Sequence, residues 1–221
     1  MSWKPMGWRF VLKRCGDDLF AIQVASPPDA QALAEQLRAS GVWLDVVPGI
    51  DSVVVRFDAA RVKATAAKRA IDESMAAGIV PLQAPDELIE ISVVYGGEYG
   101  PDLEDLCREI EMTPGEFVEM HTGSDYTVDM VGFTPGFAFV GGLDERLRIP
   151  RRKEPRLRVE AGSVGIADGR TGLYAMASPG GWTLVGRTTH KLFDANANEP
   201  FALHAGMRIR FKAIDAGVWD T

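Results

Sequence analysis

In the first part of the chain, short runs of apolar residues alternate with segments in which apolar residues recur every three to four positions, as they do in helices. The runs predict strands over 8–12, 19–24, 42–47, 52–57 and 88–95. Leu33 and Leu37 lie on one face of a helix that begins at a Ser26 cap and ends at Gly41. A second helix is expected to begin at Asp58 and to bury Val62, Ala66, Ala70 and Ile71. This order predicts an open sheet covered by two helices, in a ferredoxin-like arrangement.

A segment with two prolines separates this region from the rest of the chain. Pro81 and Pro85 interrupt any regular element between Gly78 and Pro85. We therefore place a domain boundary near Pro85. The prediction is a small N-terminal α/β domain over 1–85 and a second domain over 86–221.

The second domain begins with two short helices and continues without helical periodicity. The first helix buries an apolar face that consists of Leu103, Leu106, Cys107 and Ile110. A capping box of Thr113 and Glu116 begins the second helix. Later apolar runs alternate with glycine and proline turns at 126–131, 158–159, 163–167, 172–176, 183–186 and 207–214. Many short strands with regular turns predict a closed β-barrel or a sandwich, and the fold class is therefore α+β.

Composition and charge exclude several classes of function. The formal net charge is −7 and the isoelectric point is about 5.1, so the chain lacks the basic surface that nucleic-acid binding requires. Two cysteines at unrelated positions predict neither a disulfide framework nor a zinc site. The chain has no apolar run of about 20 residues and no signal-peptide pattern, so we expect no membrane span and a cytoplasmic location.

The common catalytic signatures are missing from the sequence. It contains no G-x-x-x-x-G-K-[ST] loop and no G-x-G-x-x-G after a strand. Ser163 lies in Ala-Gly-Ser-Val-Gly, which lacks the first glycine of a nucleophile elbow. The three histidines, at 121, 190 and 204, do not have the spacing of metal ligands. We therefore expect no metal site and no self-contained hydrolase of a common type.

An aromatic run and an arginine cluster remain as candidate binding elements. The run 132–139 places Phe133, Pro135 and Phe137 on a Gly/Pro backbone, which allows close approach of a ligand but is equally typical of a tight corner with inward-facing rings. The segment 150–158 concentrates positive charge, and Arg guanidinium groups suit carboxylate or phosphate. Its alternative interpretation is a solvated loop, although flanking prolines favour a fixed presentation.

Two further features have a functional and a structural interpretation. Gly180 and Gly181 could turn their amides toward an anion as a nest does, whereas the simpler interpretation is a hairpin turn with Trp182 in the core. His121, with Tyr126 nearby, could act as a general acid or base, but a histidine in a last helical turn is more often a cap.

Several short motifs occur in an order that resembles the kinase A inhibitor family, also called allophanate hydrolase subunit 1 or carboxyltransferase subdomain C/D. The motifs are Tyr95-Gly96, Gly100-Pro101-Asp102-Leu103, His121, Tyr126-Thr127-Val128, Gly132-Phe133-Thr134-Pro135-Gly136-Phe137, Gly141-Gly142-Leu143, Pro150-Arg151-Arg152, Pro155-Arg156, Ala161-Gly162-Ser163-Val164, Thr171-Gly172-Leu173-Tyr174, Pro179-Gly180-Gly181-Trp182, Gly186-Arg187-Thr188 and Leu192-Phe193-Asp194. The resemblance covers residue 87 to the end with high specificity. Over the first third it rests on layout.

The resemblance implies a fold, a reaction and partners. It implies a cyclophilin-like β-barrel behind the small α/β domain. The family's best-defined role is as the B-subunit of a bacterial ATP-dependent 5-oxoprolinase, which opens 5-oxo-L-proline to L-glutamate with ATP hydrolysis. This chain would be a non-autonomous lactam hydrolase subunit with a homologous C-subunit and an A-subunit as partners, and ATP would bind at a shared site. The candidate residues are His121 for catalysis and, for substrate or nucleotide binding, Tyr126, Phe133, Pro135, Phe137, Arg151, Arg152, Arg156, Ser163, Gly180, Gly181, Trp182 and Arg187.

Two other functions remain open within this resemblance. One is a regulatory protein that inhibits a sensor histidine kinase, as the family's founding member does. The other is a carboxyltransferase-type subunit that acts on urea or a related amide. A true allophanate hydrolase activity is disfavoured, because the chain lacks the glycine/serine-rich stretch that carries a Ser-Ser-Lys centre.

Overall fold

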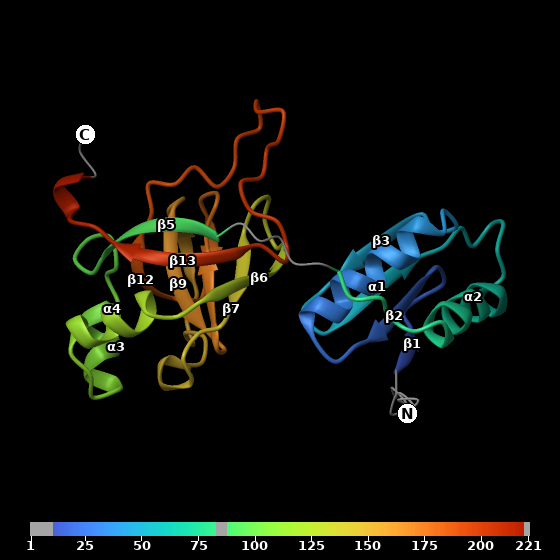
Figure 1. Ribbon diagram of the computed structural model, residues 1–221, viewed down its shortest axis with the longest axis horizontal. Helices are drawn as coiled ribbons and strands as arrows, with labels where there is room; N and C mark the ends of the chain where they lie inside the picture. Colours follow the sequence, from blue (N-terminus) through green and yellow to red (C-terminus); the bar gives the residue numbers. More distant parts are fainter. Residues whose placement is uncertain (1–10, 83–87, 219–221) are drawn as a thin grey trace, which may run out of the picture. The chain divides into compact units, whose positions relative to one another are not determined.

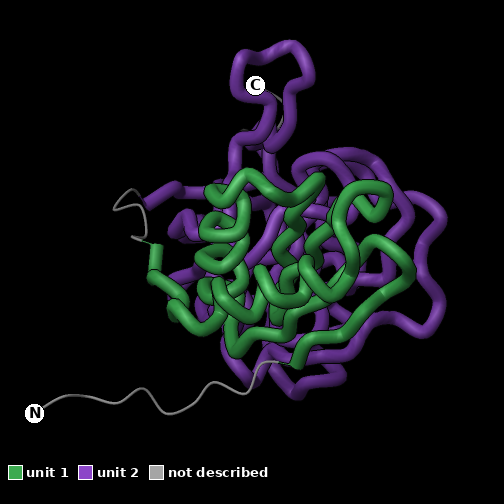
Figure 2. The backbone as a smooth tube through the Cα atoms, turned by 90° about the vertical axis from the view of Figure 1, so that its right-hand side faces the viewer, with its two compact units in different colours: residues 1–83 green, residues 84–221 purple. Residues whose placement is uncertain are grey.

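The chain divides into two compact units, Met1–Gln83 and Ala84–Thr221 (Figure 2). The computed structural model describes residues 11–82 and 88–218. The predicted boundary at Pro85 lies outside these described residues. Within the described ranges, no helix has both the length and the apolar character that a membrane crossing requires.

The first unit is a four-stranded sheet with two helices. Its elements are β1 (Leu12–Arg14), β2 (Leu19–Gln23), α1 (Pro27–Ala39), β3 (Asp45–Pro48), β4 (Ser52–Arg56) and α2 (Ala64–Ala76). The strand order is β1-β2-β4-β3, with antiparallel neighbours throughout. Strands β2 and β3 therefore run parallel with β4 between them, which is the split β-α-β arrangement of ferredoxin-like folds. Both helices contribute to a single core with the sheet, in which Ile22, Leu33, Leu37, Val53 and Ile71 are fully buried.

Helix α1 begins where its capping residues predict, but α2 does not. The Ser26 hydroxyl accepts a hydrogen bond from the Asp29 amide, and Pro27 is the first helical residue. Asp58 instead forms an isolated turn, because its carbonyl accepts from the Val62 amide at 2.8 Å and its carboxylate from the Ala60 amide at 3.0 Å. Helix α2 starts only at Ala64. Its buried residues are therefore Ala67 and Ile71, while Ala66 is exposed.

The second unit is built around a closed barrel of seven strands (Figure 1). The strands are β5 (Leu88–Tyr95), β6 (Tyr126–Val131), β7 (Ala138–Gly141), β9 (Ser163–Ala167), β10 (Arg170–Leu173), β12 (Thr183–Arg187) and β13 (Arg208–Ala213). Their order is β10-β7-β6-β13-β5-β12-β9, and β9 pairs with β10 to close the barrel. Strands β5 and β13 are the parallel pair. The α+β class and the barrel are thus confirmed, and the sandwich alternative is excluded.

Helices α3 (Leu103–Glu109) and α4 (Pro114–Thr122) pack against the barrel core. Leu106, Cys107 and Phe117 are buried in the same cluster as Ile91 and Phe211 of the barrel strands. The predicted capping box is present, since Thr113 and Glu116 exchange hydrogen bonds between side chain and amide. The remaining elements are η1 (Glu145–Leu147), β8 (Arg156–Val159), β11 (Ser178–Gly180) and η2 (Ala216–Val218).

The strand prediction differs from the structure for β7, β10 and β11 in this unit, and β11 lies in the glycine segment for which a hairpin turn was the simpler expectation. Strand β7 occupies the end of the aromatic run, which the glycine and proline content had assigned to an irregular segment. Strand β10 spans Arg170–Leu173 rather than 172–176, because it pairs with β9 directly after a tight turn in which Asp168 has φ +50° and Gly169 +75°.

Candidate functional site

An aromatic cluster of Phe137, Phe139, Tyr174 and Trp182 lies on the outside of the barrel. The ring centroid of Phe137 is 4.7 Å from that of Phe139, 4.9 Å from Tyr174 and 5.7 Å from Trp182. Side chains alternate along a strand, so Gly172 faces outward where its neighbour Thr171 faces the core. A Cβ at Gly172 would come within 2.8 Å of Phe137 and 2.9 Å of Trp182. Glycine in this strand therefore leaves the space that the cluster occupies.

The aromatic run is divided between buried and exposed rings. Phe137 and Phe139 are buried, as the tight-corner interpretation predicts. Phe133 is 67% exposed, adopts φ +72° and lies with its ring centroid 5.6 Å from that of Phe137. Pro135 is also exposed. Phe133 and Pro135 are therefore the members of the run that a ligand or partner can reach.

Two arginines of the predicted cluster bind one carboxylate, that of Asp102. Arg156 contacts both Asp102 oxygens, at 2.9 and 2.6 Å, and Arg152 contacts Oδ1 at 3.1 Å. The same carboxylate accepts the Leu184 amide of β12 at 2.7 Å. Asp102 directly precedes α3, where a carboxylate would favour the positive end of the helix dipole, but its side chain makes no cap hydrogen bond there. It anchors the arginine segment to the barrel.

The third arginine, Arg151, is also held. Its Nε lies 3.0 Å from Asp168 Oδ2, and its guanidinium carbon is 5.7 Å from the centroid of the Trp182 ring. The backbone of the segment is fixed as well, because the Arg152 amide donates to the Gly181 carbonyl at 2.8 Å. The arginine segment is therefore held in one conformation. An anion bound here would share its guanidinium groups with Asp102 and Asp168. We call Arg151, Arg152, Arg156, Phe133 and Trp182 the arginine face.

The double glycine beside this face does not form an amide nest. Neither Gly180 nor Gly181 has a positive φ, and Gly180 lies in strand β11. A Cβ at Gly180 would overlap the Tyr174 hydroxyl, so this glycine is required for packing. Gly181 presents its carbonyl to the arginine segment. Trp182 is 5% exposed, in agreement with the structural interpretation of this motif.

Ser163 and Arg187 are cross-strand neighbours at the ends of β9 and β12. Ser163 is 4% exposed, and its carbonyl accepts the Tyr174 amide at 3.0 Å. Arg187 donates from Nε to the Ala161 carbonyl at 2.9 Å. These two residues therefore support the backbone next to Tyr174.

His121 and Tyr126 lie in the barrel core, apart from the aromatic cluster. His121 is fully buried, with Nδ1 2.7 Å from the Tyr95 hydroxyl and Nε2 3.0 Å from Thr171 Oγ1. Burial lowers the pKa of His121 to about 3, so the ring is neutral near pH 7. The Tyr126 hydroxyl donates to the His121 carbonyl at 2.9 Å, and burial raises the pKa of Tyr126. A general acid or base must reach its substrate, and this geometry gives His121 no such access.

Among residues 11–82 and 88–218, no three His, Cys, Asp or Glu side chains are grouped so that they could hold a metal ion.

Comparison with known proteins places this chain in a family. The profile of the carboxyltransferase domain, subdomain C and D, matches residues 1–203. The chain belongs to this family. It is 37% identical to the 5-oxoprolinase B-subunit of Bacillus subtilis over 93% of both chains, and 38% identical to the 5-oxoprolinase B-subunit of Escherichia coli O157:H7 over 89% of this chain and 90% of the relative.

Solved structures share the fold. The crystal structure of TTHA0988 is 30% identical with a TM-score of 0.75, and the match covers 90% of this chain but 40% of that longer one. The Kluyveromyces lactis urea carboxylase is 17% identical with a TM-score of 0.77, and the match covers 96% of this chain and 22% of that one. At that identity the second likeness concerns the fold alone.

Proposed function

We propose that this chain is a subunit of an ATP-dependent 5-oxoprolinase complex that hydrolyses 5-oxo-L-proline to L-glutamate in the cytoplasm. The observation that carries the proposal is its similarity to the 5-oxoprolinase B-subunit of Bacillus subtilis over 93% of the length of both chains. The chain is active only with a homologous C-subunit and an A-subunit.

The architecture of the site supports a role that depends on partners. His121 is sealed in the core, whereas the side chains of Arg151, Arg152 and Arg156 are at least partly exposed. TTHA0988 adds an independent argument, because the part similar to this chain is 40% of a longer polypeptide. A region that is fused to further sequence in one relative is well suited to act beside a separate partner polypeptide in another relative.

The arginine face suits one step of such a reaction. A five-membered lactam resists hydrolysis. Transfer of the γ-phosphoryl group of ATP to its amide oxygen releases ADP and activates the carbonyl carbon; attack by water then breaks the ring C–N bond and releases inorganic phosphate. The transferring phosphoryl group carries negative charge on its equatorial oxygens, and preorganised guanidinium groups stabilise that charge. We assign Arg151, Arg152 and Arg156 to this role, at an ATP site shared with a partner subunit. Phe133 and Pro135 contact the substrate or that partner.

The test is an alanine series in the reconstituted complex. Arg151→Ala is the most informative variant, because its side chain is 59% exposed and its loss should leave the fold intact. We expect 5-oxoproline-stimulated ATP hydrolysis to fall at least about tenfold, as for loss of a charge-stabilising group. Arg108→Ala, which removes an exposed arginine on α3, is the matched control and should retain full activity.

Complex formation is measured in parallel by size-exclusion chromatography. Full ATP-coupled activity in the variants of all three arginines would refute the assignment of the arginine face. A wild-type chain that does not bind the C-subunit, but inhibits a sensor histidine kinase, would refute the enzymatic role itself.

A further inference from the structure

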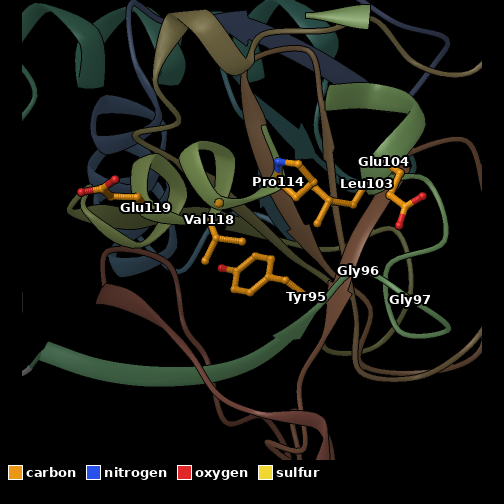
Figure 3. Close-up of a pocket in the computed structure, with 9 residues that line it drawn as sticks. Tyr95, Gly96, Gly97, Leu103, Glu104, Pro114, Val118 and Glu119 are labelled. Carbon is orange, nitrogen blue, oxygen red and sulfur yellow. The ribbon is translucent and has the colours of Figure 1, made fainter. Parts of the chain in front are cut away.

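A pocket of about 540 Å³ opens where β5 ends, between helices α3 and α4 (Figure 3). Tyr95 lines it from the strand, Leu103 from α3, and Pro114 and Val118 from α4. The Tyr95 ring and the Val118 side chain lie next to each other in its floor. The pocket belongs to neither the arginine face nor the aromatic cluster, so nothing in the proposed reaction accounts for it.

The pocket is open rather than enclosed. Gly97, Pro114 and Gly115 are exposed members of its lining. Sites for small molecules bury about 70–90% of their ligand, which a depression with exposed walls does not do. A depression with an apolar floor is instead suited to a single anchoring side chain from another protein surface.

The rim of the pocket is acidic. Glu104 of α3 and Glu119 of α4 lie on opposite sides of it, with carboxylates that point away from each other (Figure 3), and both residues are exposed. Neither carboxylate has a hydrogen-bond or ion-pair partner among the described residues, whereas nearby Asp102 and Asp105 are both paired with arginines. Two free negative charges around an apolar floor complement a cationic side chain with an aliphatic stem.

Buried hydrogen bonds hold the Tyr95 ring in the floor of the pocket. The Tyr95 hydroxyl is hydrogen-bonded to His121 Nδ1 at 2.7 Å, and His121 Nε2 is 3.0 Å from Thr171 Oγ1. These buried hydrogen bonds fix the Tyr95 ring through its hydroxyl group. A preordered aromatic floor lowers the cost of binding and offers a face on which a guanidinium group can stack. This gives His121 a positioning role in place of the catalytic one.

We propose that this pocket is a docking site for a lysine or arginine side chain of a partner subunit. The stem of that side chain packs between Leu103, Pro114 and Val118, and its charge is attracted by Glu104 and Glu119 from the two sides of the rim. This inference rests on the proposed function, since it assumes that the chain assembles with the other subunits of the 5-oxoprolinase complex.

The test reverses the charge of the rim. In the Glu104→Lys, Glu119→Lys double variant we expect the affinity for the purified partner subunits to fall at least about tenfold, while the melting temperature of the chain alone stays within a few degrees of the wild type. The matched control is Glu109→Lys, Glu111→Lys, which makes the same change in net charge at exposed residues outside the pocket. Its affinity should change less than about threefold.

A second variant separates charge from shape. Glu104→Gln, Glu119→Gln keeps the size of both side chains, so it should show a weaker dependence of affinity on salt concentration than the wild type. Equal affinity of the charge-reversed variant and its control would overturn the docking site but leave the proposed function intact. Normal assembly with loss of ATP hydrolysis would also overturn it, because the pocket would then serve the chemistry. A wild-type chain that binds none of the partner subunits would refute both proposals.

Discussion

The strongest test of the arginine face is removal of the charge that organises it. Asp102→Asn keeps the size of the side chain but leaves Arg152 and Arg156 opposite a neutral amide. In the wild type the Asp102 side chain is 11% exposed and accepts four hydrogen bonds, from the Leu184 amide and from the two guanidinium groups. Loss of one partner from a buried ion pair costs about 3–5 kcal/mol.

The exposure of the two arginines reduces that figure. Their side chains are 26% exposed for Arg156 and 38% for Arg152, so water can solvate part of the charge left behind. The Leu184 amide keeps an oxygen acceptor in the variant. We therefore expect a loss of about 2–3 kcal/mol in the free energy of unfolding of the barrel unit. For a unit of this size that corresponds to a melting temperature of the barrel unit lower by roughly 4–12 °C.

The measurement must report the barrel unit and not the whole chain, because two units need not unfold together. Hydrogen exchange of peptides from 163–187 under increasing urea fulfils this condition. Asp105→Asn is the control, since that aspartate pairs with Arg108 on the surface of α3, with both side chains 76% exposed. Its loss should be below about 0.5 kcal/mol and should vanish in about 1 M salt, whereas the effect of Asp102→Asn should persist. Equal losses in the two variants would refute the view that Asp102 holds the arginine face.

Two further predictions concern the barrel core and its packing. The pKa of His121 is about 3 in the folded chain, below the value near 6.5 expected after unfolding. Its contribution to stability is therefore complete above about pH 6.5 and is lost as the pH falls toward 3, by up to about 1.4 kcal/mol per pH unit. His121→Gln should flatten urea-measured stability between about pH 6.5 and 4.5, and an unchanged slope would contradict the buried, neutral ring. Separately, Gly100→Ala places a Cβ against the Val185 carbonyl oxygen and should destabilise the chain by more than about 2 kcal/mol. Gly115 lies in helix α4, and a Cβ there would meet no atom from outside its own helix within 4 Å, so Gly115→Ala should stabilise the chain by up to about 1 kcal/mol. Similar melting temperatures for the two alanine variants would show that the contact at Gly100 is not close.

Features encoded by neighbouring residues could be predicted from the sequence. The capping box at Thr113, the limits of β5 and the buried face of α3 all depend on spacings of a few positions, and the structure agrees with them. The start of α2 was wrong for the same local reason, because an aspartate that caps a helix and one that closes a single turn look alike in sequence.

The organisation of the candidate site could not be predicted in the same way. Asp102 meets Arg152 and Arg156 across 50 and 54 positions, and no periodic pattern records that contact. A helix-terminal aspartate has a sufficient local explanation in the helix dipole, so its role as an anchor stayed hidden. The burial of His121 also depends on which strands close around it, and sequence alone left both of its interpretations open.

The parallel pairing of β5 with β13 has a consequence for biosynthesis. Arg208 pairs with Leu88, far earlier in the chain, and β13 also pairs with β6. Strand β13, which lies between β5 and β6, is thus the last of the seven barrel strands to be synthesised. Until then β5 and β6 each have an unpaired edge, and such edges invite pairing with other chains. Messages truncated before residue 208 should yield aggregates rather than shorter folded products, and cells that make this protein quickly would depend on chaperones that hold the nascent barrel until its final strand arrives.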